Sequence, residues 1–345
     1  MNYIHICDNA GKVIVSRLGP DCRDVCLGLT LAQCERCESH SGSGKRRRGK
    51  ITVPAGSVFL CADDDDMVKS KRVFMKSLDL YAEMVSGLIE IQKLTLDEVR
   101  NENRRLVHNL TTLNSHIIQE IYNIVPQDDL AGGPSRQISV IADALSAKPV
   151  PAAQAALRIL KNAVAARTEM QIVRRFQSAP QLPPQQRPHS IHKVIKNVLI
   201  TFFQDSQDQQ MYWNLRKSDE RVLIDYESVS AAFYRLFENF IKYCAPTSSI
   251  DIAFENDGKV LLVVMEMKSL QILPGEEKRI FDEGYSGAQA RKYNLNGIGL
   301  GLLVVRQMLE TNHAEISVQA GTRIEVIREV EYVPNRFVIR FLRST

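Results

Sequence analysis

The strongest constraint on this chain is a heptad pattern that continues without a break from residue 78 to residue 124. Mostly apolar residues recur there at spacings that alternate between four and three, over about seven repeats. A pattern sustained this long predicts a supercoiled pair of helices rather than one helix packed on a globular core. The positions of this seam are Leu78, Ala82, Val85, Ile89, Gln92, Leu96, Val99, Asn103, Leu106, Leu110, Leu113, Ile117, Glu120 and Ile124.

An asparagine at an a-type position of the seam indicates how the helices pair. The amide of Asn103 is better satisfied opposite the same residue of a second chain than against an aliphatic side chain. We therefore expect a parallel homodimer that the seam holds in one register.

Breaker residues bound the long helix and point to a second one. Pro126 and the run Gly132-Gly133-Pro134 are expected to end the first helix. A segment rich in Ala and Leu from about 151 to 176 predicts a second helix, so that the two would form a dimerisation hairpin. The Pro- and Gln-rich tract at 178–188 then indicates a linker.

The segment before residue 66 has the pattern of short strands, and we expect a small α/β sensor module there. Its two strand-turn-strand patterns lie at 3–6 with 13–16 and at 51–53 with 58–61. A basic run from Lys45 to Lys50 lies in a Ser- and Gly-rich context and is expected to form a solvated loop.

Cysteines cluster between these two hairpins as Cys22-x3-Cys26-x7-Cys34-x2-Cys37. Thiols stay reduced in the cytoplasm, so the spacing favours metal binding or redox chemistry over structural disulfides. Four nearby thiolates could hold a tetrahedral Zn²⁺ or an iron–sulfur cluster. The alternative is that these are small buried residues with no metal.

A histidine on the long helix is a candidate phosphoacceptor. With Leu106 and Leu110 in the seam, His108 falls on the face directed away from it and should be exposed. Asn109 follows it directly, and Thr112 lies one turn further on the same face. The alternative is an ordinary solvated helix histidine.

Residues 190–345 mix helix and strand patterns and have the size of one α+β domain. An amphipathic helix is expected at 233–243, with Asn239 and Lys242 among its polar residues. Downstream, a glycine cluster at 297–301 runs directly into another helix, where backbone N–H groups can approach phosphates. Strands are expected at 250–254, 260–265, 316–319 and 337–341.

Two other interpretations of the glycine cluster remain open from the residues alone. A dinucleotide-binding fingerprint would follow a buried strand, and Tyr293-Asn294-Leu295 does not have that pattern. The cluster could also be a flexible loop with a helix cap.

The order of these motifs resembles the ATP-binding domain of the sensor histidine kinase family over about residues 190–345. The helix resembles the N-box, in which Asn239 would coordinate Mg²⁺ and Lys242 would contact a nucleotide phosphate. The segment 281–287 resembles the F-box, and the glycine cluster resembles the G2-box. The resemblance thus implies a nucleotide site that includes Asn239, Lys242, Tyr243, Gly297, Gly299, Leu300, Gly301 and Leu302.

The resemblance also implies a fold and an activity. The chain would be a multidomain α+β protein whose C-terminal part is an α/β sandwich of the histidine kinase ATPase (Bergerat) type. ATP and Mg²⁺ would serve to phosphorylate His108, and the phosphoryl group would pass to an aspartate on a response regulator receiver domain. We expect a sensor module at 1–66, dimerisation helices at 67–177, a linker at 178–189 and the catalytic domain at 190–345.

Three positions depart from the family's pattern. The G1-box aspartate that meets the adenine amino group has no counterpart in Met267-Lys268-Ser269, and strand alternation points Glu266 to the opposite face. Asn109 stands where an acidic residue often acts as general base, and an amide cannot take up a proton. Arg235 stands where a second asparagine is common.

These departures keep two rival functions open. One is a kinase-like phosphotransferase or phosphatase with a weakened nucleotide site. The other is a non-catalytic, metal-dependent signalling scaffold that presents its coiled coil to a partner.

Composition sets the remaining expectations. The formal net charge of +4 arises from 44 basic and 40 acidic residues, so no global charge points to nucleic acid or to a membrane surface. No stretch approaches the roughly 20 apolar residues of a spanning helix, and the start lacks a leader pattern. We expect a cytoplasmic protein.

Overall fold

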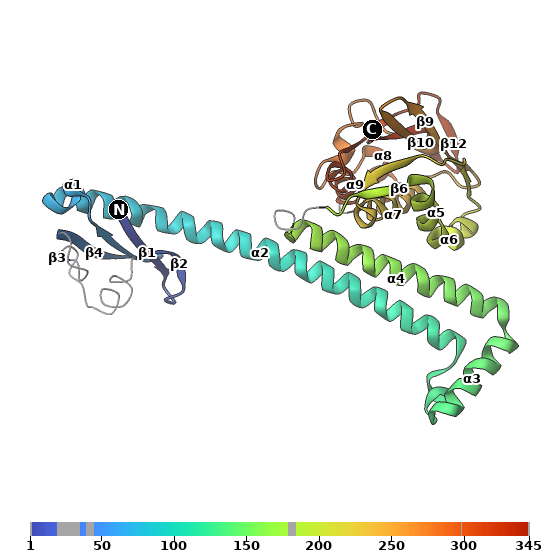
Figure 1. Cartoon of the computed structure of the whole chain (residues 1–345), viewed down its shortest axis with the longest axis horizontal. Helices are drawn as coiled ribbons and strands as arrows, with labels where there is room; N and C mark the ends of the chain where they lie inside the picture. Colours follow the sequence, from blue (N-terminus) through green and yellow to red (C-terminus); the bar gives the residue numbers. More distant parts are fainter. Residues whose placement is uncertain (1, 19–34, 39–44, 179–183, 298, 344–345) are drawn as a thin grey trace. The chain divides into compact units, whose positions relative to one another are not determined.

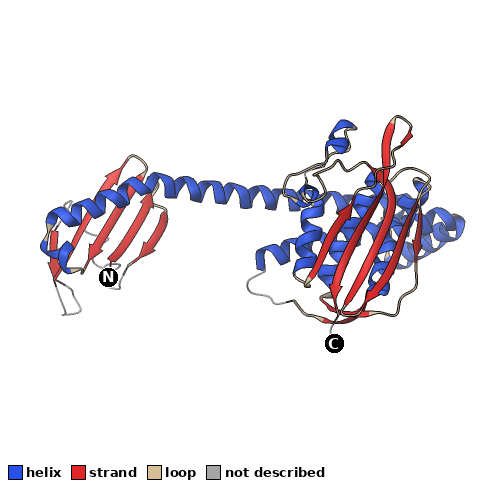
Figure 2. Cartoon of the chain, turned by 90° about the horizontal axis from the view of Figure 1, so that it is seen from above, coloured by secondary structure: helices blue, strands red, loops and turns tan. Residues whose placement is uncertain are grey.

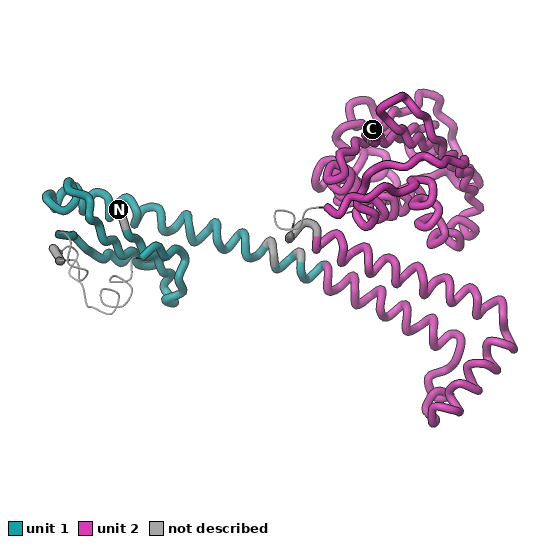
Figure 3. The backbone as a smooth tube through the Cα atoms, in the orientation of Figure 1, with its two compact units in different colours: residues 1–105 teal, residues 106–345 magenta. Residues whose placement is uncertain are grey.

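The computed structural model describes residues 2–18, 35–38, 45–178, 184–297 and 299–343. They divide into two compact units, Met1–Arg105 and Leu106–Thr345, which Figure 3 colours separately. The long helix α2 (Lys71–Ile124) contributes to both units. No helix in these described ranges is long and apolar enough to cross a membrane.

The first unit is built on a five-stranded antiparallel sheet in the order β2-β1-β5-β4-β3. Figure 2 shows its strands in red. Both predicted hairpins are confirmed, because β1 pairs with β2 and β4 pairs with β5. The strands are β1 (Asn2–Asp8), β2 (Val13–Arg17), β3 (Glu35–Glu38), β4 (Lys45–Val53) and β5 (Gly56–Ala62).

Helical residues cover one face of this sheet. After the short helix α1 (Asp65–Lys69), the start of α2 packs Phe74, Leu78 and Val85 against Ile6 and Leu60, and all five side chains are buried. The predicted dimer seam is therefore corrected at its start. Leu78, Ala82 and Val85 are covered by the chain's own sheet, because an apolar sheet face needs cover as much as a helix stripe does.

The basic run does not form the solvated loop that was predicted. Residues 45–50 belong to β4, and Arg47 is only 5% exposed. Its guanidinium donates from Nη2 to the Val68 carbonyl at 2.8 Å and from Nε to the Met67 carbonyl at 2.9 Å. The prediction was wrong because these carbonyls at the end of α1 need donors, and one arginine can satisfy several acceptors.

The second unit begins with the rest of α2 and two further helices. The first helix ends at Ile124, before Pro126, and the predicted second helix is α4 (Pro149–Ser178). Between them lie a 3₁₀ turn (Gln127–Leu130) and α3 (Pro134–Ala147), which the sequence pattern did not predict. Figure 1 shows α2 beside α4, and the Arg158 Nε atom contacts Glu120 Oε1 between them at 2.7 Å.

The C-terminal part of this unit is a two-layer sandwich. Its larger sheet has six strands in the order β11-β13-β10-β9-β7, with β12 paired to β13, and Figure 2 shows helices behind it. The four predicted strands are present. The sheet comprises β7 (Tyr212–Leu215), β9 (Ser249–Asp257), β10 (Val260–Leu270), β11 (Ala314–Gln319), β12 (Glu325–Ile327) and β13 (Val330–Leu342).

The remaining elements complete the helical layer and its edge. A two-stranded sheet pairs β6 with β8. These elements are β6 (Arg187–Ser190), α5 (Ile191–Leu199), a 3₁₀ turn (Ile200–Phe202), α6 (Phe203–Asp208), β8 (Arg221–Ile224), α7 (Tyr226–Tyr243), a 3₁₀ turn (Arg279–Phe281), α8 (Ala288–Lys292) and α9 (Gly301–Glu310).

Candidate active site

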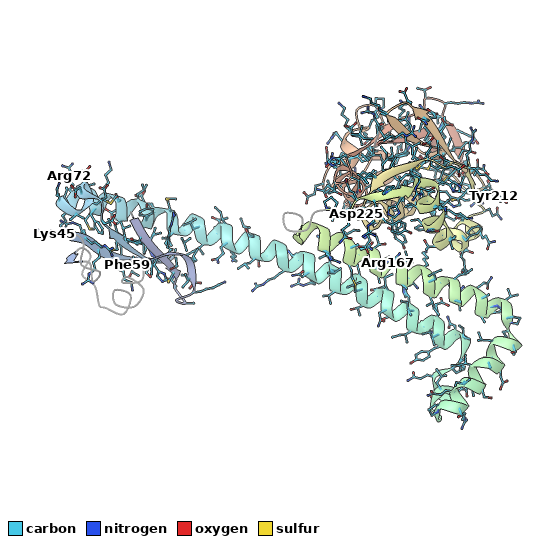
Figure 4. The ribbon with its side chains drawn as sticks, in the orientation of Figure 1. Lys45, Phe59, Arg72, Arg167, Tyr212 and Asp225 are labelled. Atoms are coloured by element: carbon cyan, nitrogen blue, oxygen red, sulfur yellow. The ribbon has the colours of Figure 1, made fainter. Side chains whose placement is uncertain are left out.

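Helix α7 carries the candidate Mg²⁺ ligand, and its start and core face fix its position. Asp225, labelled in Figure 4, caps the helix by accepting from the Ser228 amide at 2.9 Å. Phe237 and Phe240 are fully buried against the sheet. Asn239 lies on the other side, half-buried, where its Nδ2 donates to the Arg235 carbonyl at 3.0 Å.

The loop after α9 locks that helix against α7. Asn312 accepts from the Asp225 amide at 2.6 Å, and its Nδ2 donates to Ser228 Oγ at 2.7 Å. The end of α9 therefore meets the start of α7. Because the two helices run in opposite directions, the start of α9 lies near the end of α7, where Asn239 is.

Glycines bring the loop before α9 close to α7. A Cβ on Gly301 would lie 2.9 Å from Asn239 Nδ2, and one on Gly297 would lie 3.4 Å from Lys242 Nζ. Gly299 has φ +76°, and a Cβ there would lie 2.4 Å from the backbone carbon of Gly284. The loop thus rests on the F-box turn at Gly284 and faces the N-box helix.

The first turn of α9 is a candidate anion site. Leu300 occupies its N-cap without a side-chain hydrogen bond to the turn, so no capping oxygen competes for the N–H groups. Gly301 begins the helix, and Leu302 packs partly against the core. A phosphate here would meet backbone N–H donors at the positive end of the helix dipole.

Lys242 and Tyr243 border the same region at the end of α7. Lys242 is exposed overall, yet desolvation lowers its pKa from the ordinary value of 10.5. Its Nζ lies 5.2 Å from the centre of the Tyr243 ring. Burial raises the pKa of Tyr243. These two residues can offer a cation and a half-buried ring to a nucleotide.

A buried carboxylate organises the segment around the F-box, and no sequence motif indicated it. Glu276 is 6% exposed. It accepts from the Tyr285 hydroxyl at 2.6 Å, the Ala288 amide at 2.8 Å and the Leu273 amide at 2.9 Å. Burial alone would raise the pKa of Glu276, but these donors outweigh it and lower the pKa. Phe281 is buried beside this segment in the main core.

At the expected base end of the candidate site, the described strand β10 places no carboxylate on its inner face, as the sequence indicated. Strand β10 continues in regular register through Glu266, which lies on the outer face with its Oε1 3.3 Å from Arg336 Nε. Met267 and Ser269 are buried on the inner face. The strand therefore does not slip, and Glu266 cannot turn toward the helices.

Asn335 supplies a polar group on that inner face, which sequence reasoning missed. It pairs with Met267 across the sheet and is 1% exposed. Its Nδ2 donates to Ser269 Oγ at 2.7 Å and to the Leu270 carbonyl at 3.0 Å. Its Oδ1 is buried, and none of the described residues donates to it.

His108 lies on α2 in the second unit and is exposed, as predicted, like Asn109 and Thr112. The Asn109 side chain contacts Glu169 of α4, with Nδ2 3.4 Å from Oε1. Glu169 in turn contacts Arg235 of α7 at 2.5 Å. Two of the three departures from the family's pattern therefore meet at one carboxylate.

The predicted cysteine site lies mostly outside the described residues. Cys22, Cys26 and Cys34 are not described, and of Cys37 only the backbone is placed, in β3 opposite Arg46. Within the described ranges, no group of three or more His, Cys, Asp or Glu side chains could hold a metal. In β1 of the same sheet, Cys7 Sγ lies 3.0 Å from His5 Nε2, and burial raises the pKa of this thiol.

Residues 224–331 match the family described as histidine kinase-, DNA gyrase B- and HSP90-like ATPase. The chain is 29% identical over 106 residues to the probable sensor protein PcoS of Escherichia coli, which covers 31% of this chain and 22% of PcoS. It is 25% identical over 126 residues to the sensor histidine kinase WalK of Bacillus subtilis, which covers 35% of this chain and 20% of WalK. The chain thus matches only about a fifth of the length of these relatives.

Solved structures of histidine kinases are only distantly similar to the chain. The histidine kinase ThkA in complex with the response regulator protein TrrA has 13% identity and a TM-score of 0.39, covering 99% of this chain and 96% of that one. A catalytic domain of ThkA has 16% identity and a TM-score of 0.36, covering 46% and 97%. Residues 224–331 thus match the histidine kinase-, DNA gyrase B- and HSP90-like ATPase family, and over about a third of its length the chain is similar to sensor histidine kinases.

Proposed function

We propose that this chain is a sensor histidine kinase that phosphorylates His108 from ATP and passes the phosphoryl group to an aspartate of a response regulator. The observation that carries the proposal is that Gly301, in the first turn of α9 without a side-chain cap, lies against the side chain of Asn239. This arrangement offers a side-chain oxygen and backbone N–H donors to one set of phosphates.

Two observations test whether the residues fit ATP. A Cβ on Gly301 would lie 2.9 Å from Asn239 Nδ2, so glycine at this position lets the first turn of α9 approach the candidate Mg²⁺ ligand closely. The buried Asn335 Oδ1 is an acceptor that an adenine amino group could satisfy. We propose that Asn239 would hold Mg²⁺, which when bound offsets the charge that moves during phosphoryl transfer.

The exposed imidazole of His108 is the proposed nucleophile. One ring nitrogen attacks the γ-phosphorus of ATP, the bond to the bridging oxygen breaks, and ADP leaves with that electron pair. Asn109 can hold the phosphoacceptor region by hydrogen bonding, but it cannot take up a proton. Thr112, one turn on, can donate a hydrogen bond on the same face.

A homodimer remains part of the proposal. Beyond the turns that the sheet covers, α2 exposes Val107, Ile118 and Ile121, and α4 exposes Leu157 and Leu160. Exposed apolar side chains on two adjacent helices support burial against a second copy. Val107, Ile118 and Ile121 are not positions of the predicted seam, so the interface proposed for the second unit differs from that seam.

The cysteine cluster is proposed as a metal or redox site that controls the kinase. Cys22, Cys26, Cys34 and Cys37 precede the helix that leads to His108, so a change of ligation could bias two states of that helix. The domain boundaries given above and a cytoplasmic location also remain proposals. Metal analysis of protein purified without oxygen or chelator, with Cys34→Ser/Cys37→Ser as control, tests the site.

A kinase-like phosphotransferase or phosphatase is the second candidate. Met267 and Ser269 occupy the inner face where an adenine-binding carboxylate would be expected, and Asn109 cannot act as a base. Both observations favour a protein that binds nucleotide weakly and transfers phosphate without efficient self-phosphorylation.

Incubation with γ-labelled ATP separates these functions. The kinase predicts an acid-labile, base-stable label on the wild type that His108→Gln abolishes. His116→Gln is the matched control, because His116 is also exposed on α2, and its label should persist. Nucleotide binding without label would favour the second candidate, and neither binding nor label would favour the non-catalytic scaffold.

A further inference from the structure

One carboxylate of α4 contacts two positions at which this chain departs from the family's pattern. Arg235 Nη2 donates to Glu169 Oε1 at 2.5 Å, and Asn109 Nδ2 donates to the same oxygen at 3.4 Å. The three side chains come from α7, α4 and α2, and Asn109 directly follows His108. Glu169 thus links the helix of the candidate Mg²⁺ ligand with the helix of the phosphoacceptor.

The contact is largely withdrawn from water. The side chains of Glu169 and Arg235 are 15% and 23% exposed. Arg235 also donates from Nη1 to Glu238 Oε2 at 2.8 Å. Burial alone would lower the pKa of Arg235, but Glu238 and Glu169 outweigh it and raise this pKa. A charged, partly buried arginine with two carboxylate partners fixes geometry better than an exposed ion pair.

Apolar packing surrounds the same contact. Ala165 and Ile172, one turn before and after Glu169 on α4, are buried in one cluster with Phe233 and Leu236 of α7. Asn239 lies one turn beyond Arg235 along α7. The Glu169–Arg235 pair therefore sits where it can set the position of the N-box helix on the hairpin.

We propose that Glu169 is a positioning residue for phosphoryl transfer: it holds α7 beside the turn of α2 that carries His108. This inference rests on the proposed function. Because one oxygen accepts from both Asn109 and Arg235, the side chain next to the phosphoacceptor and the N-box helix are coupled. No contact joins Glu169 to the glycine loop among the described residues, so it should affect the transfer step rather than nucleotide affinity.

The test compares full-length wild type with Glu169→Gln, which keeps the size of the side chain and removes its charge. We expect the autophosphorylation kcat to fall roughly ten- to a hundredfold, the loss that a small misplacement of reacting groups causes. The KM for ATP and the Kd for ADP should stay within about twofold. A merely structural role would change these two constants together with kcat.

Asp205→Asn is the matched control. Lys161 of α4 contacts Asp205 of α6 at 2.6 Å, with side chains 31% and 28% exposed, so this pair also joins α4 to the ATPase domain but does not touch Asn109. Its kcat should change less than about twofold. In a double-mutant cycle, Glu169→Gln with Arg235→Gln should be no slower than the slower single variant. Equal losses in Glu169→Gln and Asp205→Asn, or additive losses in the cycle, would overturn the inference.

A second readout keeps this inference separate from the proposed function. If the wild type takes no label, the proposed kinase fails, and positioning is then read from amide hydrogen exchange. Glu169→Gln should speed exchange in both 106–113 and 230–240, and Asp205→Asn should do so in neither. Unchanged exchange in the two segments of Glu169→Gln would sink the positioning role whether or not the protein is a kinase.

Discussion

The phosphate end and the base end of the candidate nucleotide site are built in different ways. At the phosphate end, Gly299 and Gly301 bring backbone against Gly284 and Asn239, and a helix start faces the gap. At the base end, the inner face of β10 offers Met267 and Ser269, and Asn335 adds one buried amide. The first end depends on backbone geometry and the second on single side chains.

This difference determines how the residues of such a site can change. Almost any sequence supplies backbone N–H donors, provided that glycine remains at the positions where a Cβ would collide with neighbouring atoms. Base recognition depends on the identity of one or two side chains and is lost or replaced by single substitutions. A chain can therefore keep phosphate binding while its adenine contacts diverge, and the predictions below test that division.

The largest effect is expected for Gly299→Ala. Its Cβ would lie 2.4 Å from the Gly284 carbon at φ +76°, so the loop must move away from the F-box turn. ADP affinity measured by calorimetry should fall at least about thirtyfold, equivalent to roughly 2 kcal/mol. Gly258→Ala is the control, because Gly258 has φ +58° in the β9–β10 turn with nothing within 4 Å of a Cβ. If both variants bind ADP like wild type, the loop does not form the phosphate end.

A smaller loss is expected for Gly301→Ala. The new Cβ would lie 2.9 Å from Asn239 Nδ2, a side-chain atom that can shift by a few tenths of an ångström. We expect ADP affinity to fall about tenfold, roughly 1.4 kcal/mol. Gly297→Ala should change affinity far less, because its Cβ would lie 3.4 Å from the flexible Lys242 ammonium. Equal affinity of wild type and Gly301→Ala would remove this loop from the site.

A substitution at the base end should change the selectivity for the base rather than the affinity for phosphate. Asn335→Leu removes the buried Oδ1, so the preference for ADP over GDP should fall roughly fivefold, the value of about one neutral hydrogen bond. Affinity for inorganic triphosphate should stay the same. Ser269→Ala controls for the lost Asn335–Ser269 hydrogen bond. An unchanged preference in Asn335→Leu would show that Asn335 does not meet the base.

The smallest effect concerns pH. Desolvation lowers the pKa of Lys242, so its positive charge is lost at a lower pH than that of a fully hydrated lysine. ADP affinity should therefore weaken as pH rises into the alkaline range, by about twofold for one partly screened contact. Lys242→Met should show a flat profile over the same range. A slope that persists in this variant would assign the titration to another group.

The sequence predicted well what local patterns determine. Turn and strand patterns predicted the hairpin at 3–16, and periodicity predicted the strands at 260–265 and 337–341. The helix breaker Pro126 predicted the end of α2. The exposure of His108 followed from its place in the heptad.

Contacts between distant residues were not predictable in this way. Arg47 was assigned to a solvated basic run because composition does not reveal its hydrogen-bond partners. These partners are the backbone carbonyls of residues 67 and 68. The spacing of Leu78 and Val85 fits a dimer seam as well as it fits a helix stripe that covers a sheet. Periodicity alone cannot distinguish these two structures. Glu169 and Asn335 lie far in sequence from the residues they contact, and neither belongs to a motif.

The most direct test of this division between the phosphate end and the base end is a calorimetric titration of the full chain with ADP and with adenosine, both in the presence of Mg²⁺. We predict that ADP binds measurably and that adenosine binds at least about a hundredfold more weakly, because the phosphate end supplies most of the affinity. Adenosine that binds as tightly as ADP would contradict the division between the two ends. Absence of binding by both ligands would contradict the nucleotide site itself.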